Sequence, residues 1–195
     1  MNLHQQNMIT QQLPTLLIYS RIFLGIAIGL TAIINPDNSG LIISMLMFVA
    51  IVTDILDGII ARKLGVATQR LRILDSNVDL FFWLISLSAI FLLNPQFFAQ
   101  HIRFILLVFF LEMLAYFVSF FKFRKSVATH TYLAKFWSVF LFLFLTELAV
   151  TGNSTYLFWV VIGLGCLSRA EIILILWLTP IWKTDISSIF NLFNT

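Results

Sequence analysis

The sequence predicts an all-α integral membrane protein with six transmembrane helices. Of its 195 residues, 60% are hydrophobic and only 11% are charged, against roughly 45–50% and about 25% in an ordinary soluble domain. Six apolar runs are each long enough to cross a bilayer, which takes about 20 residues. They leave no room for a sizeable soluble domain, so we expect one transmembrane domain over residues 1–195.

The boundaries of the six spans follow from the residues that interrupt the apolar runs. The first span ends before NPDNSG, the third before NPQ, the fifth at TGNST and the sixth before Pro180, while basic loops separate the second from the third and the fourth from the fifth. Each span should be a helix, because the bilayer core offers no water to unpaired backbone groups and the runs lack the alternation of a barrel strand. The expected spans are residues 14–34, 40–62, 75–93, 103–121, 131–150 and 155–179.

The basic residues predict the orientation of the chain in the membrane. They gather between spans two and three, between spans four and five, and after span six, whereas the opposite loops are nearly bare. By the positive-inside rule both termini should be cytoplasmic, and a bacterial-type inner or plasma membrane is the expected location. The net charge of +3 does not indicate a nucleic-acid partner, because the basic residues lie between apolar spans rather than in a soluble patch.

Four of the nine acidic residues fall within one stretch of 26 residues at the end of span two and the start of span three. Asp54 and Asp57 are three residues apart, and Asp75 and Asp79 are four apart, so each pair shares one helical face. A carboxylate inside a span costs several kcal/mol unless it is paired, hydrated or metal-bound. Four of them also repel one another, so the cluster predicts bound cations.

The residue types around the aspartates narrow the kind of cation and ligand. Carboxylate ligands without a Cys or His cluster favour Mg²⁺, Mn²⁺ or Ca²⁺ over zinc, and four can hold two ions about 3.5–4 Å apart beside a phosphoryl group. Gly58 and Ala61 would keep the acidic face open, and Arg62 suits a phosphate. Taken alone, Gly58 is more typical of helix packing, and Arg62 is more typical of a topology anchor.

This stretch resembles the signature of the CDP-alcohol phosphotransferase family, D-x-x-D-G-x-x-A-R followed after about eight residues by G-x-x-x-D-x-x-x-D. The matching residues are Asp54, Asp57, Gly58, Ala61, Arg62, Asp75 and Asp79. The opening residues Pro14, Leu17 and Arg21 also resemble the family's P-N-x-L-T-x-x-R lead-in. One signature position departs, because Leu71 stands where relatives carry a glycine that helps to make room for the cytidine nucleotide.

The resemblance implies a phospholipid biosynthesis enzyme that uses Mg²⁺ or Mn²⁺, with two ions expected. A CDP-linked lipid donor, CDP-diacylglycerol in most relatives, would pass its phosphatidyl group to an alcohol acceptor and release CMP. Asp54, Asp57 and Asp75 would bind metal, and Asp79 would be the general base and also contact the second ion. Gly58, Ala61 and Arg62 would bind the nucleotide and phosphate. Relatives commonly form homodimers, so a dimer is expected on that ground alone.

The acceptor site is less clearly marked. Lys135 corresponds to a region where phosphate-accepting relatives carry a lysine, and with the short chain it favours glycerol 3-phosphate as acceptor. Arg169 lies deep in span six, where a charge needs a partner, and the sequence offers Glu171, Glu147 or Glu112. Two other interpretations remain open: a cation- or proton-coupled transporter, since intramembrane carboxylates also carry ions, and an inactive family member.

Overall fold

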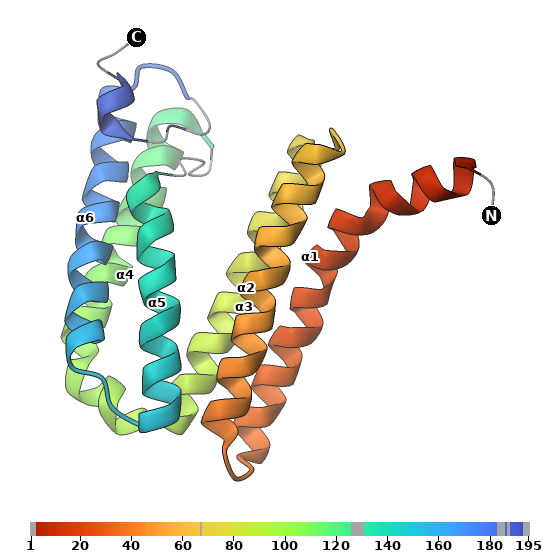
Figure 1. Cartoon of the computed structure of the whole chain (residues 1–195). Helices are drawn as coiled ribbons and strands as arrows, with labels where there is room; N and C mark the ends of the chain where they lie inside the picture. The colour runs from red at the N-terminus through yellow and green to blue at the C-terminus, as the bar shows by residue number, and fades with distance from the viewer. Residues whose placement is uncertain (1–2, 67, 126–130, 183–185, 187, 193–195) are drawn as a thin grey trace. The chain divides into compact units, whose positions relative to one another are not determined.

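The computed structural model describes residues 3–192 apart from 67, 126–130, 183–185 and 187. Six long helices and one short 3-10 helix follow one another, and the described residues contain no strand (Figure 1). The all-α fold with six spans that the sequence predicts is confirmed. The elements are α1 (Leu3–Ile34), α2 (Ser39–Lys63), α3 (Gln69–Leu93), α4 (Pro95–Phe123), α5 (Tyr132–Thr151), α6 (Tyr156–Leu178) and η1 (Ile189–Leu192).

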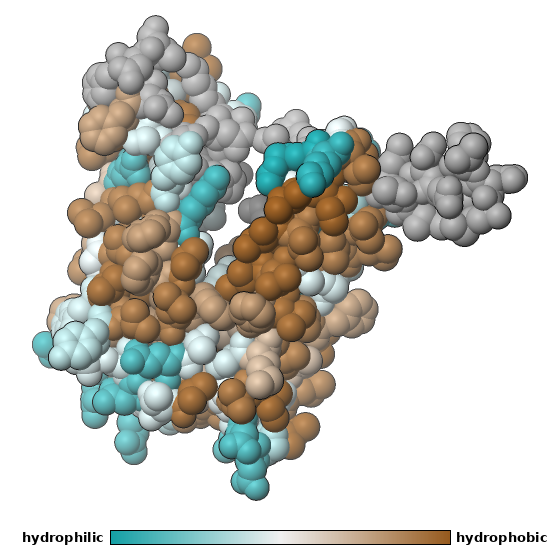
Figure 2. All heavy atoms as spheres, viewed as in Figure 1, coloured by the Kyte–Doolittle hydropathy of each residue, from teal (hydrophilic) through white to brown (hydrophobic). Residues whose placement is uncertain are grey.

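The apolar side chains of these helices point mostly outward. In each of the six candidate spans fewer than half of the residues are buried within the protein, and hydrophobic residues cover much of the visible face in Figure 2. In water, exposed apolar surface of this extent would drive association or aggregation. Lipid removes that penalty, so the surface itself indicates a bilayer environment.

The first compact unit consists of residues 1–95 together with 148–152. Its helix α1 packs along both α2 and α3, whereas α2 and α3 make few contacts with each other (Figure 1). Side chains from all three helices are buried along these seams, among them Ile18, Met47 and Phe82. Helix α1 is therefore the element that joins the other two, and a side chain on its inner face can reach both.

The turn between α2 and α3 is short. Helix α2 ends where the N–H of Val66 donates to the carbonyl of Ala61 at 3.0 Å, and Gly65 adopts a φ of +68°, the left-handed conformation that ends many helices. Thr68 caps the start of helix α3, because its hydroxyl accepts a hydrogen bond from the N–H of Leu71 at 3.3 Å. Because the turn is this short, the two consecutive helices α2 and α3 run in opposite directions.

The second compact unit consists of residues 96–147 and 153–195. The indole N–H of Trp137 on α5 donates to the carbonyl of Val161 on α6 at 3.0 Å. A Cβ placed on Gly165, one turn further along α6, would lie 3.0 Å from Trp137 Nε1 and 3.1 Å from Val108 Cγ1 on α4. The missing side chain at position 165 thus allows α4, α5 and α6 to approach closely.

This packing predicts that Gly165→Ala destabilises the protein. The added methyl would press on Trp137 and Val108, and overpacking of this kind typically costs about 1–3 kcal/mol. We expect a lower melting temperature in detergent. The matched control is Gly163→Ala on the same helix, because a Cβ there meets nothing within 4 Å among the described residues. Equal melting temperatures for the two variants would contradict the close approach at Gly165.

Candidate metal centre

The turn between α2 and α3 brings the four aspartates to one level. Asp57 precedes the end of α2 at Lys63 by six residues, and Asp75 follows the start of α3 at Gln69 by six. Because α2 and α3 are antiparallel and rise equally per residue, the two positions lie opposite each other. The i, i+3 and i, i+4 spacings then place Asp54 and Asp79 one turn further into the helices.

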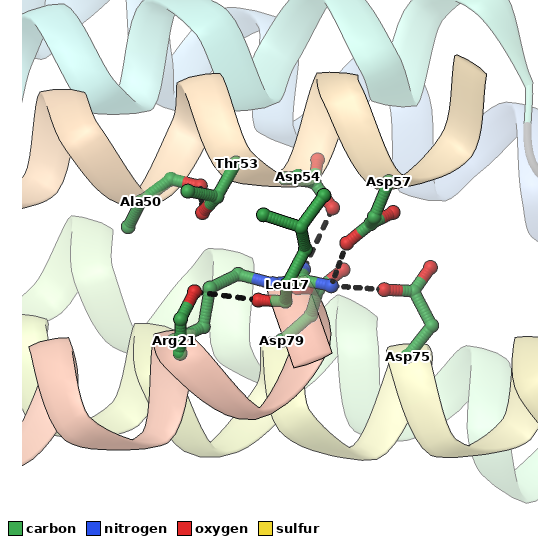
Figure 3. A network of polar contacts seen from close by, with 9 residues as sticks. Leu17, Arg21, Ala50, Thr53, Asp54, Asp57, Asp75 and Asp79 are labelled. Atoms are coloured by element: carbon green, nitrogen blue, oxygen red, sulfur yellow. Dashed lines mark hydrogen bonds and ion pairs between the residues drawn. The ribbon is translucent and has the colours of Figure 1, made fainter. Parts of the chain in front are cut away.

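All four carboxylates meet on one guanidinium group, that of Arg21 on α1 (Figure 3). Arg21 Nη1 donates to Asp54 Oδ1 at 2.6 Å and also to Asp79 Oδ1. Arg21 Nη2 donates to Asp57 Oδ2 at 2.8 Å and also to Asp75 Oδ1. Each terminal nitrogen therefore bridges one carboxylate of α2 and one of α3.

Arg21 is the functional residue that sequence reasoning did not assign to the acidic cluster. It lies within the first span, Gln12–Ile34, and its side chain is only 1% exposed. Two sequence features point to a role for Arg21. An arginine inside a span needs a partner, and Arg21 belongs to the residues that resemble the lead-in of the family signature. What the sequence lacked was the packing of α1 against both α2 and α3, which carries Arg21 to both pairs of aspartates.

The charges in this cluster do not balance. One guanidinium faces four carboxylates, so three negative charges remain in a part of the protein formed by membrane-spanning helices. Carboxylates this close repel one another strongly, and further cations relieve that repulsion. The cluster thus has the electrostatic character of a cation site that Arg21 only partly neutralises.

Three of the carboxylates have the geometry of a metal site. One oxygen from each of Asp54, Asp57 and Asp75 lies within 4.8 Å of the others, and oxygen ligands of this kind suit Mg²⁺ and Mn²⁺. The side chain of Asp57 is 4% exposed and that of Asp54 is 44% exposed, so the group is buried on one side and accessible on the other. The residues present fit a divalent ion that also contacts a ligand from outside.

The neighbouring signature residues occupy the same two helices. Within 4 Å of a Cβ placed on Gly58 lie only atoms of the Arg62 guanidinium, the nearest being Nη1 at 3.4 Å. Among the described residues, a side chain at position 58 would therefore meet no other helix, and the Arg62 guanidinium lies over this position. Ala61 is buried. Leu71 lies one turn before Asp75 on α3 and is partly buried.

Arg169 and Lys135 belong to the second unit and have different surroundings. Of the three glutamates considered as partners for Arg169, the structure selects Glu112 on α4, which accepts from Arg169 Nε at 2.5 Å. The Arg169 guanidinium also lies 3.8 Å from the centroid of the Trp137 ring. Lys135 is exposed, with its Nζ 5.9 Å from the centroid of the Tyr132 ring.

The fold and the cluster first define a class: multi-pass membrane proteins whose spanning helices carry a group of carboxylates that could hold a divalent cation. Residues 11–179 match the family model described as CDP-alcohol phosphatidyltransferase. Because the match covers most of the chain, the protein belongs to this family, whose members are transferases of phospholipid biosynthesis and generally depend on a divalent metal. No curated protein and no solved structure matches the chain.

The charge imbalance predicts that Asp75→Asn stabilises the protein when divalent ions are chelated. Asp75 is attracted by one guanidinium and repelled by the three other carboxylates of the same cluster, so the repulsions that act on it outnumber the attraction. We expect the melting temperature in chelator to rise by about 2–4 °C, the shift that 1 kcal/mol produces in a chain of this size. The further rise that Mn²⁺ produces in the wild type should disappear.

The matched control for this prediction is Asp37→Asn. Asp37 is exposed in the turn between α1 and α2, so its loss should change neither the melting temperature in chelator nor the response to Mn²⁺. A melting temperature of Asp75→Asn in chelator that falls below that of the wild type would show that attraction to Arg21 outweighs repulsion among the carboxylates.

Proposed function

We propose that the protein transfers a phosphatidyl group from CDP-diacylglycerol to an alcohol and releases CMP. The observation that supports this most strongly is the convergence of four carboxylates from α2 and α3 on one point among membrane-spanning helices. Membership of the family supports a CDP-alcohol donor. The match spans residues 11–179, which supports treating the chain as one functional domain.

Asp54, Asp57 and Asp75 are the residues proposed to hold the first metal ion, and Asp79 would contribute to a second. When bound, Mg²⁺ or Mn²⁺ neutralises the diphosphate of the donor and the charge that develops on the leaving phosphate. The exposed side of Asp54 is where a diphosphate would approach the site. Arg62 on α2 is suited to a phosphate oxygen because its guanidinium is planar and permanently charged. Gly58 and Ala61 present little side-chain bulk on the same helix.

Asp79 is the proposed general base. Its carboxylate would accept the proton of the acceptor hydroxyl as the hydroxyl oxygen attacks the phosphorus that carries diacylglycerol. The bond from that phosphorus to the bridging oxygen of CMP then breaks, and CMP leaves with the electron pair. The proton passes from Asp79 to solvent, so the reaction yields a phosphodiester lipid, CMP and one proton.

Glycerol 3-phosphate is the acceptor we propose, with Lys135 as its phosphate contact. Lys135 is exposed and makes no ion pair with a described residue, so its ammonium is available to an anion. Arg169 is the second acceptor residue proposed. Because Glu112 already neutralises Arg169, we expect Arg169 to contribute less than Lys135 to binding a phosphate.

We further propose an orientation with both termini in the cytoplasm of a bacterial-type plasma membrane and assembly as a homodimer. The distribution of basic residues supports the orientation, since soluble nucleotide and glycerol 3-phosphate would then meet the site from the cytoplasm. The family resemblance is the support for the dimer.

The proposed activity is tested with purified protein, Mg²⁺ or Mn²⁺ and CDP-diacylglycerol. The acceptors offered are glycerol 3-phosphate, serine, inositol phosphate, phosphatidylglycerol and choline, and the measurement is CMP release. We expect release with glycerol 3-phosphate and none without metal. Ion flux in proteoliposomes without CMP release for any acceptor would instead favour a transporter, and neither activity would favour an inactive relative.

Asp79→Ala should lower turnover by about 10²–10⁴-fold, the usual contribution of a positioned base. Binding of CDP in the presence of Mn²⁺ should stay close to the wild type, because Asp54, Asp57 and Asp75 remain. CMP release and CDP binding by calorimetry measure the two effects, with Asp37→Ala as the exposed control. Loss of both properties, or of neither, would contradict this division of roles.

Lys135→Met should raise the KM for glycerol 3-phosphate by about 10–100-fold, since a charge-assisted hydrogen bond contributes about 1.5–3 kcal/mol. The KM for CDP-diacylglycerol and the turnover number should change little. Arg103→Met is the matched control, because Arg103 is exposed near the start of α4, at the opposite end of that helix from the loop before Lys135. An unchanged KM for glycerol 3-phosphate would remove Lys135 from the acceptor site.

A further inference from the structure

The guanidinium of Arg21 lies where a metal ion would have to lie. Each of the three carboxylates with metal-site geometry, those of Asp54, Asp57 and Asp75, accepts a hydrogen bond from Arg21. A Mg²⁺ ion requires oxygen ligands at about 2.0–2.1 Å, so an ion shared by these carboxylates must sit between α2 and α3. Both terminal nitrogens of Arg21 already occupy that space, because each bridges the two helices.

We infer that Arg21 is the resident counter-ion of the acidic cluster and that it competes with the divalent ion for the same carboxylates. In this arrangement Arg21 holds the four aspartates together when no divalent ion is bound, and it withdraws when an ion enters. The inference deepens the proposed function and rests on it, because it concerns the same site. It makes Arg21 a positioning residue that sets how tightly metal binds.

Two features of Arg21 favour its displacement by a divalent ion. Its Nε is buried and has no hydrogen-bond partner among the described residues, an unsatisfied donor that costs free energy for as long as the side chain stays in place. A guanidinium also brings one positive charge to four carboxylates, whereas each divalent ion brings two. The ion therefore relieves more of the repulsion among the aspartates than Arg21 does.

A purely structural role for Arg21 makes the opposite prediction for metal binding. If Arg21 only held the aspartates in place, its removal would scatter them and weaken metal affinity. If Arg21 competes with the ion, its removal leaves the negative charge of the carboxylates without a counter-ion in the absence of metal. Binding of a divalent ion then becomes more favourable. The direction of the change in metal affinity therefore separates the two roles.

The experiment measures Mn²⁺ binding to purified full-length protein without substrate, using the electron paramagnetic resonance signal of free Mn²⁺. Arg21→Met should bind Mn²⁺ at least about tenfold more tightly than the wild type. In chelator its melting temperature should fall below that of the wild type, and the rise on adding Mn²⁺ should be larger, since a ligand that binds the folded state stabilises it. Lys63→Met, which removes a charge from the exposed last residue of α2, should behave as the wild type.

Arg21→Lys keeps the test decisive if Arg21→Met does not fold in chelator. One ammonium cannot bridge both pairs of aspartates as the guanidinium does, so the Mn²⁺ affinity of this variant should lie between those of the wild type and Arg21→Met. Equal or weaker Mn²⁺ binding in the Arg21 variants, with normal binding in the wild type, would overturn the competition and leave the proposed function standing. Absence of Mn²⁺ binding in the wild type would overturn both.

Discussion

The structure of the first unit depends on one buried guanidinium that faces four carboxylates. Arg21 is almost inaccessible to solvent and donates to Asp54, Asp57, Asp75 and Asp79. Its two terminal nitrogens connect α1 to both α2 and α3, and the latter two helices make few direct contacts. The arginine therefore contributes to the assembly of these three helices as well as to the charge of the site.

The same cluster supports the proposed chemistry on phosphates. Four negative charges against one positive charge are unfavourable among membrane-spanning helices, and divalent ions lower that cost while they leave coordination positions for a diphosphate. The turn at Gly65 is short, which places the two pairs of aspartates at the same level of α2 and α3.

In the second unit, a charged side chain within a membrane-spanning helix is neutralised by one side chain of opposite charge. Arg169 Nε donates to one glutamate, Glu112, its Nη1 donates to Ser168 Oγ at 2.6 Å, and its guanidinium stacks on Trp137. One cation faces one anion, and no further ion is required for neutrality. The contrast with the four-to-one cluster at Arg21 explains why the acidic cluster, rather than the Arg169 pair, is the candidate metal centre.

The sequence by itself determined the six helices, the acidic pairs and the family, because these depend on local properties: apolar length, spacing along a helix and a signature within 26 residues. Only the tertiary structure decided which charges meet. Arg21 reaches aspartates 33 to 58 residues away in the chain, and Arg169 selects Glu112, 57 residues away, over Glu171, which is two residues away but faces η1. Such pairings follow from how helices pack against one another, and a single sequence does not encode that packing in its periodicity.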